Sequence, residues 1–135
     1  MNWKRFALAA FVIFVLANIN GFVIHSVILH DDYAGFPNLL RTEQEVQGYI
    51  HFMTLGLLVY SLAFAWIYAQ GISDTPWLGQ GVRFGVAVWM MTSVPGFLTY
   101  YTVQPWPGML VAKQIGLELV GVLILGVAVA FVHRK

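Results

Sequence analysis

A single carboxylic acid interrupts a long apolar stretch near the end of the chain. Glu118 lies about nine positions into the apolar segment from Met109 to Val132. At about 1.5 Å of rise per residue, a helix over this segment carries Glu118 to the middle of a membrane. A charged side chain at that depth costs roughly 2.5 kcal/mol or more. Glu118 must therefore be neutral or paired with another polar group.

Two polar residues in other apolar segments reach a similar depth. Asn18 and Thr92 are the expected neighbours of Glu118, and Pro95 frees a backbone carbonyl near Met91 because proline has no N–H to donate. We therefore predict a polar centre at the membrane midplane formed by Glu118, Asn18 and Thr92. A protonated Glu118 that locks the helices together is the favoured interpretation. A proton or cation relay and a contact with a ligand or partner are the alternatives.

Two histidines form a second candidate site. His25 precedes the end of the first apolar segment, and His51 follows the start of the second, so both reach a similar depth on neighbouring helices. Paired imidazoles can ligate a haem from opposite sides, and together with His30, Asp31 and Asp32 they offer nitrogen and oxygen ligands for a divalent metal. We favour structural histidines that bond water or neighbours. No cofactor is therefore expected, with haem as the alternative.

Other chemistries find no support in the sequence. The chain has no cysteine, which excludes thiolate catalysis and Cys-based metal sites. No serine has a histidine and an acid at a recognisable spacing, and phosphate-binding and dinucleotide-binding glycine patterns are absent. A net charge of +1 gives no basic field for nucleic acid. We therefore expect a protein that is not an enzyme and does not bind nucleic acid.

The elements that must position these residues are membrane-spanning helices. Of the 135 residues, 59% are hydrophobic and only 10% are charged, whereas soluble domains contain about 25% charged residues. Four segments have the roughly 20 apolar residues that a spanning helix needs. They run approximately from Phe6 to Leu29, Tyr49 to Gln70, Val82 to Val103 and Met109 to Val132. We predict an all-α, polytopic membrane protein whose single domain is a compact bundle of four transmembrane helices.

The distribution of basic residues predicts the orientation of the bundle. Lysine and arginine accumulate on the cytoplasmic side of membrane proteins. Two basic residues, Arg41 and Lys113, fall on one side of the expected spans. The other side carries five: Lys4, Arg5, Arg83, Arg134 and Lys135. Both termini are therefore expected in the cytoplasm.

Two local patterns predict where a helix starts and how helices pack. Thr42 and Glu45 have the spacing of a capping box, so the second helix should begin near Thr42, outside the membrane. Gly81 and Gly85 form a small-x-x-x-small pattern, which fits either packing inside the chain or a seam between copies. We expect a homo-oligomer or association with a larger membrane complex.

The sequence also resembles a group of small bacterial four-span inner-membrane proteins that have no established activity. The resemblance extends over nearly the whole chain. It rests on Tyr68 to Gly71, Pro76 to Gly85, Pro95, Gly96 and Glu118. It implies a multi-pass location in the bacterial inner membrane and a four-helix fold, and it implies no mechanism.

Two classes of function remain after these exclusions. The first is a small non-enzymatic integral membrane protein, either an accessory subunit of a membrane complex or a small carrier with a polar midplane centre. The second is a haem-binding electron-transfer subunit that uses His25 and His51. We favour the first, because a transmembrane electron path usually needs two cofactors and the chain lacks further histidine pairs on facing helices.

Overall fold

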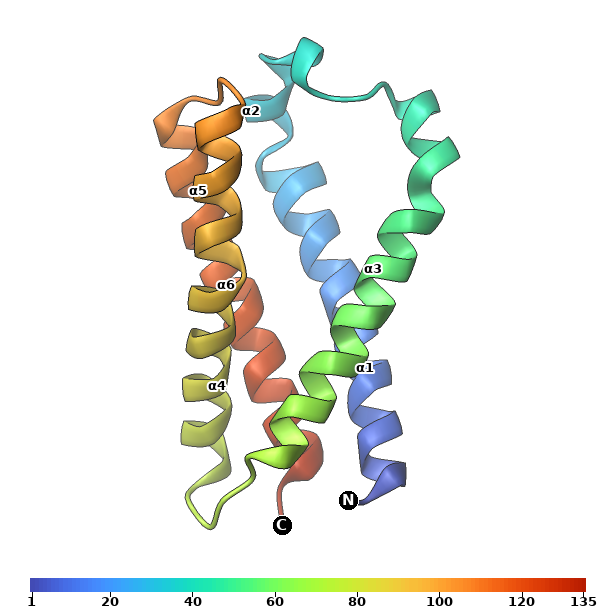
Figure 1. Cartoon of the computed structure of the whole chain (residues 1–135), viewed down its shortest axis with the longest axis vertical. Coiled ribbons are helices and arrows are strands. Elements are labelled where there is room, and N and C mark those ends of the chain that lie inside the picture. The colour runs from blue at the N-terminus through green and yellow to red at the C-terminus, as the bar shows by residue number, and fades with distance from the viewer.

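The chain is entirely helical in a computed structural model that describes residues 1–135 (Figure 1). Its elements are α1 (Trp3–Gly21), the π-helix η1 (Phe22–Ile28), α2 (His30–Ala34), the 3₁₀ helix η2 (Pro37–Leu39), α3 (Glu43–Gln70), α4 (Trp77–Met91), α5 (Ser93–Val103) and α6 (Gly108–His133). Both termini lie at one end of the molecule, here called the terminal end. Helix α2 lies at the opposite, distal end (Figure 1).

Four helical segments are long and apolar enough to cross a membrane, and each overlaps one of the segments expected from the sequence. They are Trp3–Ile28, Glu43–Gln70, Trp77–Val103 and Gly108–His133. The prediction of an all-helical chain with four such segments is confirmed.

Helix α3 begins at Glu43, ahead of the apolar run, because Thr42 caps it. The Glu45 backbone N–H donates to Thr42 Oγ1 at 3.3 Å, and the Thr42 backbone N–H donates to Glu45 Oε2 at 3.1 Å. These reciprocal bonds satisfy two backbone donors that a helix start would otherwise leave free. The predicted capping box is therefore confirmed.

The third segment is broken near its middle, at Thr92. Pro95 has no N–H to donate to the Met91 carbonyl, so the regular ladder cannot pass this point. Helical hydrogen bonds resume on either side of the break, from Thr92 N to Val88 O at 2.9 Å and from Gly96 N to Thr92 O at 3.1 Å. Helix α4 therefore ends at Met91, and α5 continues from Ser93.

Helices α4 and α6 approach each other closely because glycines face each other at their crossing. A Cβ atom on Gly81 would lie 2.6 Å from the Gly126 carbonyl oxygen, and one on Gly85 would lie 3.0 Å from Val122 O. A Cβ atom on Gly126 would lie 3.0 Å from Gly85 Cα. The pattern at Gly81 and Gly85 thus serves packing inside the chain, one of the two alternatives that the sequence left open.

This crossing predicts that two glycines of α6 respond oppositely to the same substitution. Gly126→Ala should destabilise the protein by about 1–3 kcal/mol, because the added methyl group overpacks the crossing. Gly116→Ala is the matched control, since a Cβ there meets nothing within 4 Å and alanine favours a helix. Unfolding of the purified variants in detergent measures both. A Gly126→Ala variant as stable as Gly116→Ala would contradict the packing.

The buried core occupies the half of the molecule nearer the terminal end. Its twelve residues come from the first part of α1, the last part of α3, α4 and the last part of α6: Ala9, Ala10, Ile13, Ala17, Phe64, Ala65, Tyr68, Val88, Val122, Leu125, Val129 and Ala130. Towards the distal end, α3 leans away from the other helices (Figure 1). Every residue of α3 from Glu43 to Gly56 is exposed. Helix α3 therefore separates above this core, whereas a smaller buried cluster of Ile24, Leu29 and Leu110 joins the end of the first segment to α6 nearer the distal end.

Candidate functional site: a polar cavity above the core

A cavity of about 630 Å³ lies where α3 diverges from α1. The side chains of Phe22 and Met53, which are 64% and 57% exposed, belong to its lining and mark its open side between η1 and α3. Half of its sixteen lining residues carry polar side chains: Asn18, Asn20, His25, Ser26, Tyr60, Thr92, Ser93 and Glu118. The eight include His25 and Glu118, and ionisable side chains of these two types are rare within spanning segments and usually mark functional pathways or sites.

A histidine and a carboxylic acid on this wall form a pair that joins the first and last spanning segments. His25 Nε2 lies 3.0 Å from Glu118 Oε1, with the two side chains 35% and 22% exposed. Glu118 is the eleventh residue of α6 and lies about 15 Å from the start of that helix. The pair provides the partner that a carboxyl group at this depth requires.

The π-helix η1 carries His25 towards α6. Its wider turns use bonds between residues five apart, as in the 2.9 Å bond from Leu29 N to Ile24 O. Just before it, Asn20 Nδ2 donates to the Gly121 carbonyl of α6 at 3.0 Å. Short π-helical turns within α-helices occur frequently at functional sites. The local backbone and the Asn20 bond thus fix the first span against α6 beside the pair.

A chain of hydrogen bonds leads from α6 through α2 to His25 and Glu118. Gln114 Nε2 donates to the Tyr33 hydroxyl oxygen at 2.9 Å, and that hydroxyl lies 2.7 Å from His25 Nδ1. A neutral imidazole carries its proton on one ring nitrogen and accepts on the other, so His25 donates to one of these two partners and accepts from the other. The chain runs from Gln114 to Tyr33, His25 and Glu118.

Tyr33 connects this chain to the distal surface. It lies in α2, outside the four spanning segments, and its ring packs edge-on against Trp106 with centroids 5.9 Å apart. Burial raises the pKa of the Tyr33 hydroxyl, and the bond from Gln114 offsets part of this effect. The hydroxyl therefore keeps its proton at physiological pH. Beside it, Lys113 Nζ lies 2.9 Å from Asp32 Oδ1 in an exposed ion pair.

The three residues predicted to form a midplane centre all line the cavity, yet they do not bond to one another. Asn18 Nδ2 donates to Phe14 O of its own helix at 2.7 Å, and Thr92 Oγ1 donates to Val88 O of its own helix at 2.8 Å. The carboxyl group of Glu118 bonds His25 instead. Asn18 and Thr92 thus line the cavity wall without a bond to Glu118.

The two histidines singled out from the sequence occupy different environments. Both ring nitrogens of His25 are engaged, whereas His51 is exposed on α3, packs on Phe52 with centroids 4.2 Å apart, and does not line the cavity. His25 would have to give up one of its bonds to ligate iron, and no second imidazole lines the cavity beside it. No group of three or more His, Asp or Glu side chains is close enough to hold a metal ion. Haem binding stays a prediction.

Three members of the site were not among the predicted site residues: Tyr33, Gln114 and Asn20. A signal existed for Gln114, which lies one helical turn before Glu118 on the same face of α6. Tyr33 belongs to a short connection, and no periodicity marks it as facing the bundle. Its role depends on the tertiary placement of α2.

Comparisons with protein-family models, with curated proteins and with solved structures find no match to this chain. The geometry of the cavity is therefore the basis for assigning a function.

The His25 to Glu118 bond predicts different outcomes for two substitutions of the acid. Glu118→Gln offers both an oxygen acceptor and an N–H donor to His25 Nε2, so the bond is kept and stability should change by less than about 1 kcal/mol. Glu118→Leu leaves His25 Nε2 without its partner and should destabilise the protein by about 1–2 kcal/mol. Unfolding in detergent measures the difference. Equal stability of the two variants would show that the bond contributes nothing to the fold.

Proposed function

We propose that the chain is a small non-enzymatic carrier in the bacterial inner membrane. It spans the membrane four times with both termini in the cytoplasm, and it takes a small polar ligand into the cavity between α1, η1, α3, α5 and α6. The His25 and Glu118 pair is its polar centre and passes protons across the cavity whether or not a ligand is bound. The cavity volume of about 630 Å³ lies within the roughly 300–1,000 Å³ typical of small-molecule sites.

The observation that carries this proposal is the hydrogen-bond chain from Tyr33 through His25 to Glu118. It joins a group outside the spanning segments to a carboxyl group at membrane depth. A histidine between a phenol and a carboxyl group can pass a proton by exchanging the roles of its two ring nitrogens. A purely structural lock needs a single satisfied pair and does not require the polar wall contributed by Ser26 and Ser93.

Proton flux into liposomes tests the proposal directly. Liposomes that contain the purified protein and an entrapped pH-sensitive dye should acidify when a membrane potential draws protons inward. Glu118→Gln should reduce this flux to the level of protein-free liposomes, because an amide cannot take up and release the proton. The variant should remain folded, as its hydrogen bond to His25 is kept.

Thr54→Ala provides the matched control for the flux experiment. Thr54 is a polar residue of a spanning segment whose hydroxyl bonds Ile50 O of its own helix at 3.1 Å, and it does not line the cavity. This variant should conduct as the wild type does. The carrier proposal would be contradicted if liposomes with the wild-type protein were no more permeable to protons than protein-free liposomes. Full proton flux through the Glu118→Gln variant would contradict it as well.

An accessory subunit of a membrane complex is the second candidate, and the exposed distal half of α3 favours it. No other part of the chain covers the residues from Glu43 to Gly56. A neighbouring subunit on this face would close the open side of the cavity. A photo-activatable residue at Met53 should then crosslink to one specific protein in the native membrane, whereas crosslinks to lipid alone would reject this candidate.

The proposed orientation predicts opposite labelling of the two surface connections. Asn38 follows α2 at the distal end, Thr75 lies between α3 and α4 at the terminal end, and both are exposed. The chain has no cysteine, so Asn38→Cys and Thr75→Cys each introduce the only thiol. A membrane-impermeant maleimide should label Asn38→Cys in intact cells and Thr75→Cys only after permeabilisation. Labelling of both from the same side would refute the topology.

A further inference from the structure

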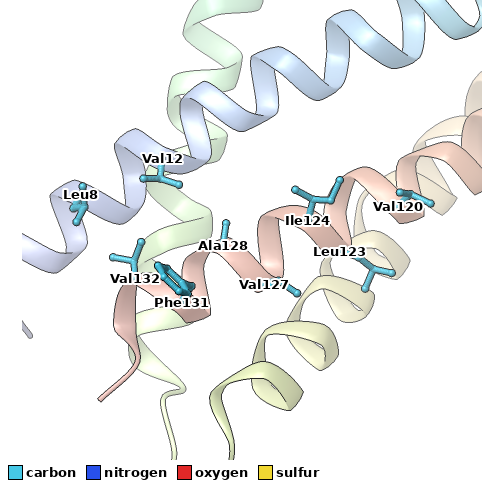
Figure 2. Close-up of a pocket in the computed structure, with 9 residues that line it drawn as sticks. All are labelled: Leu8, Val12, Val120, Leu123, Ile124, Val127, Ala128, Phe131 and Val132. Atoms are coloured by element: carbon cyan, nitrogen blue, oxygen red, sulfur yellow. The ribbon is translucent and has the colours of Figure 1, made fainter.

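A second and larger hollow lies on the outer surface of the bundle, between α1 and α6. It measures about 840 Å³, and all of its lining side chains are hydrophobic: Leu8, Val12, Val120, Leu123, Ile124, Val127, Ala128, Phe131 and Val132. Figure 2 shows Leu8 and Val12 on α1 and the other seven along α6, from Val120 to the terminal end. We call this hollow the α1/α6 groove. It shares no residue with the polar cavity.

Basic side chains surround the groove where it reaches the terminal end. The Arg134 guanidinium lies 3.7 Å from the ring centroid of Phe131, a lining residue. Lys4 precedes Leu8 by four positions and is therefore on the same face of α1. Arg5 Nη1 donates to the His133 carbonyl at 3.3 Å and so bridges α1 and α6 at this end. The apolar groove thus has a cationic mouth.

The charges at this mouth are not neutralised within the chain. Neither Lys4 nor Arg134 takes part in an ion pair. The acid of the connection between α3 and α4, Asp74, is 97% exposed and lies 3.5 Å from Lys135 Nζ. The other surface acids are in the distal part of the sequence around α2 and the start of α3: Asp31, Asp32, Glu43 and Glu45. The terminal end therefore favours an anion.

We propose that the α1/α6 groove is a binding site for an anionic phospholipid. The acyl chain lies in the groove, and the phosphate lies at the mouth against Lys4 and Arg134. Inside a membrane an apolar groove alone does not select one lipid over another, because lipid tails surround every outer face. Selection must therefore come from the headgroup, and basic residues next to the membrane surface attract anionic lipids. The site belongs to the leaflet around the termini, whichever way the chain is oriented.

Native mass spectrometry of the protein released from detergent micelles tests this site. Phosphatidylglycerol and phosphatidylcholine with identical acyl chains serve as probes. The wild type should retain phosphatidylglycerol preferentially, with one lipid per chain. The double variant Lys4→Gln, Arg134→Gln should reduce that preference by about an order of magnitude or more, since each basic residue near an anionic surface contributes roughly fivefold. Arg5 is left intact because it bridges two helices.

Two further variants separate the groove from general charge. The Arg41 guanidinium lies 3.9 Å from the ring centroid of Tyr49, so it packs on an aromatic ring as Arg134 does, but away from the groove. Arg41→Gln should therefore keep the lipid preference. Ile124→Trp fills the groove from a side chain that is 45% exposed and should weaken retention with the basic residues unchanged. Equal retention of both lipids by the wild type would overturn the proposal. Loss of preference in Arg41→Gln, or competition by free glycerol phosphate as effective as by the lipid, would also overturn it.

Discussion

The close approach of α4 and α6 is the constraint on which the rest of the molecule depends. In lipid there is no hydrophobic force between helices, so dispersion contacts at short separation must hold them together. Facing glycines at Gly81, Gly85 and Gly126 permit this separation. Helix α6 is thereby fixed along its length, and it presents different faces to α4 and to α1. Its Glu118 and Gln114 side chains reach η1 and α2, so the glycine crossing also sets where the polar chain can form.

The polar cavity follows from the uneven packing of α3. At the terminal end, small side chains such as Ala65 and Ser61 let α3 join the core, and both are fully buried. Towards the distal end α3 separates and leaves polar groups of the first and last spans facing open space. The chain satisfies the most demanding of these groups internally, by pairing Glu118 with His25. The packed half of the bundle thus supports an open half that is lined with polar side chains.

Much of the fold was predictable because it depends on local sequence. Four apolar segments, the capping box at Thr42 and the break before Pro95 each leave a signal within a few residues. The site was predictable in part. The position of Glu118 within an apolar segment identified it as a candidate site residue. Asn18 and Thr92 line the same cavity, as expected, but the hydrogen-bond partner of Glu118 was not predictable. His25 follows Asn18 by seven residues and so shares its helical face, but this spacing does not identify it as the partner of Glu118. Tyr33 reaches the site through the fold of a connection, which leaves no periodic pattern.

The first and last helices of the chain both end at the terminal end (Figure 1). The Arg5 guanidinium bonds the carbonyl of His133 there and so joins them. An even number of crossings returns the chain to the side from which it started. Two copies joined head to tail by a short linker would therefore insert with the same polarity and need no extra crossing between them. The architecture is thus compatible with duplication within one polypeptide, in which each half keeps its own cavity and the linker stays on a single side.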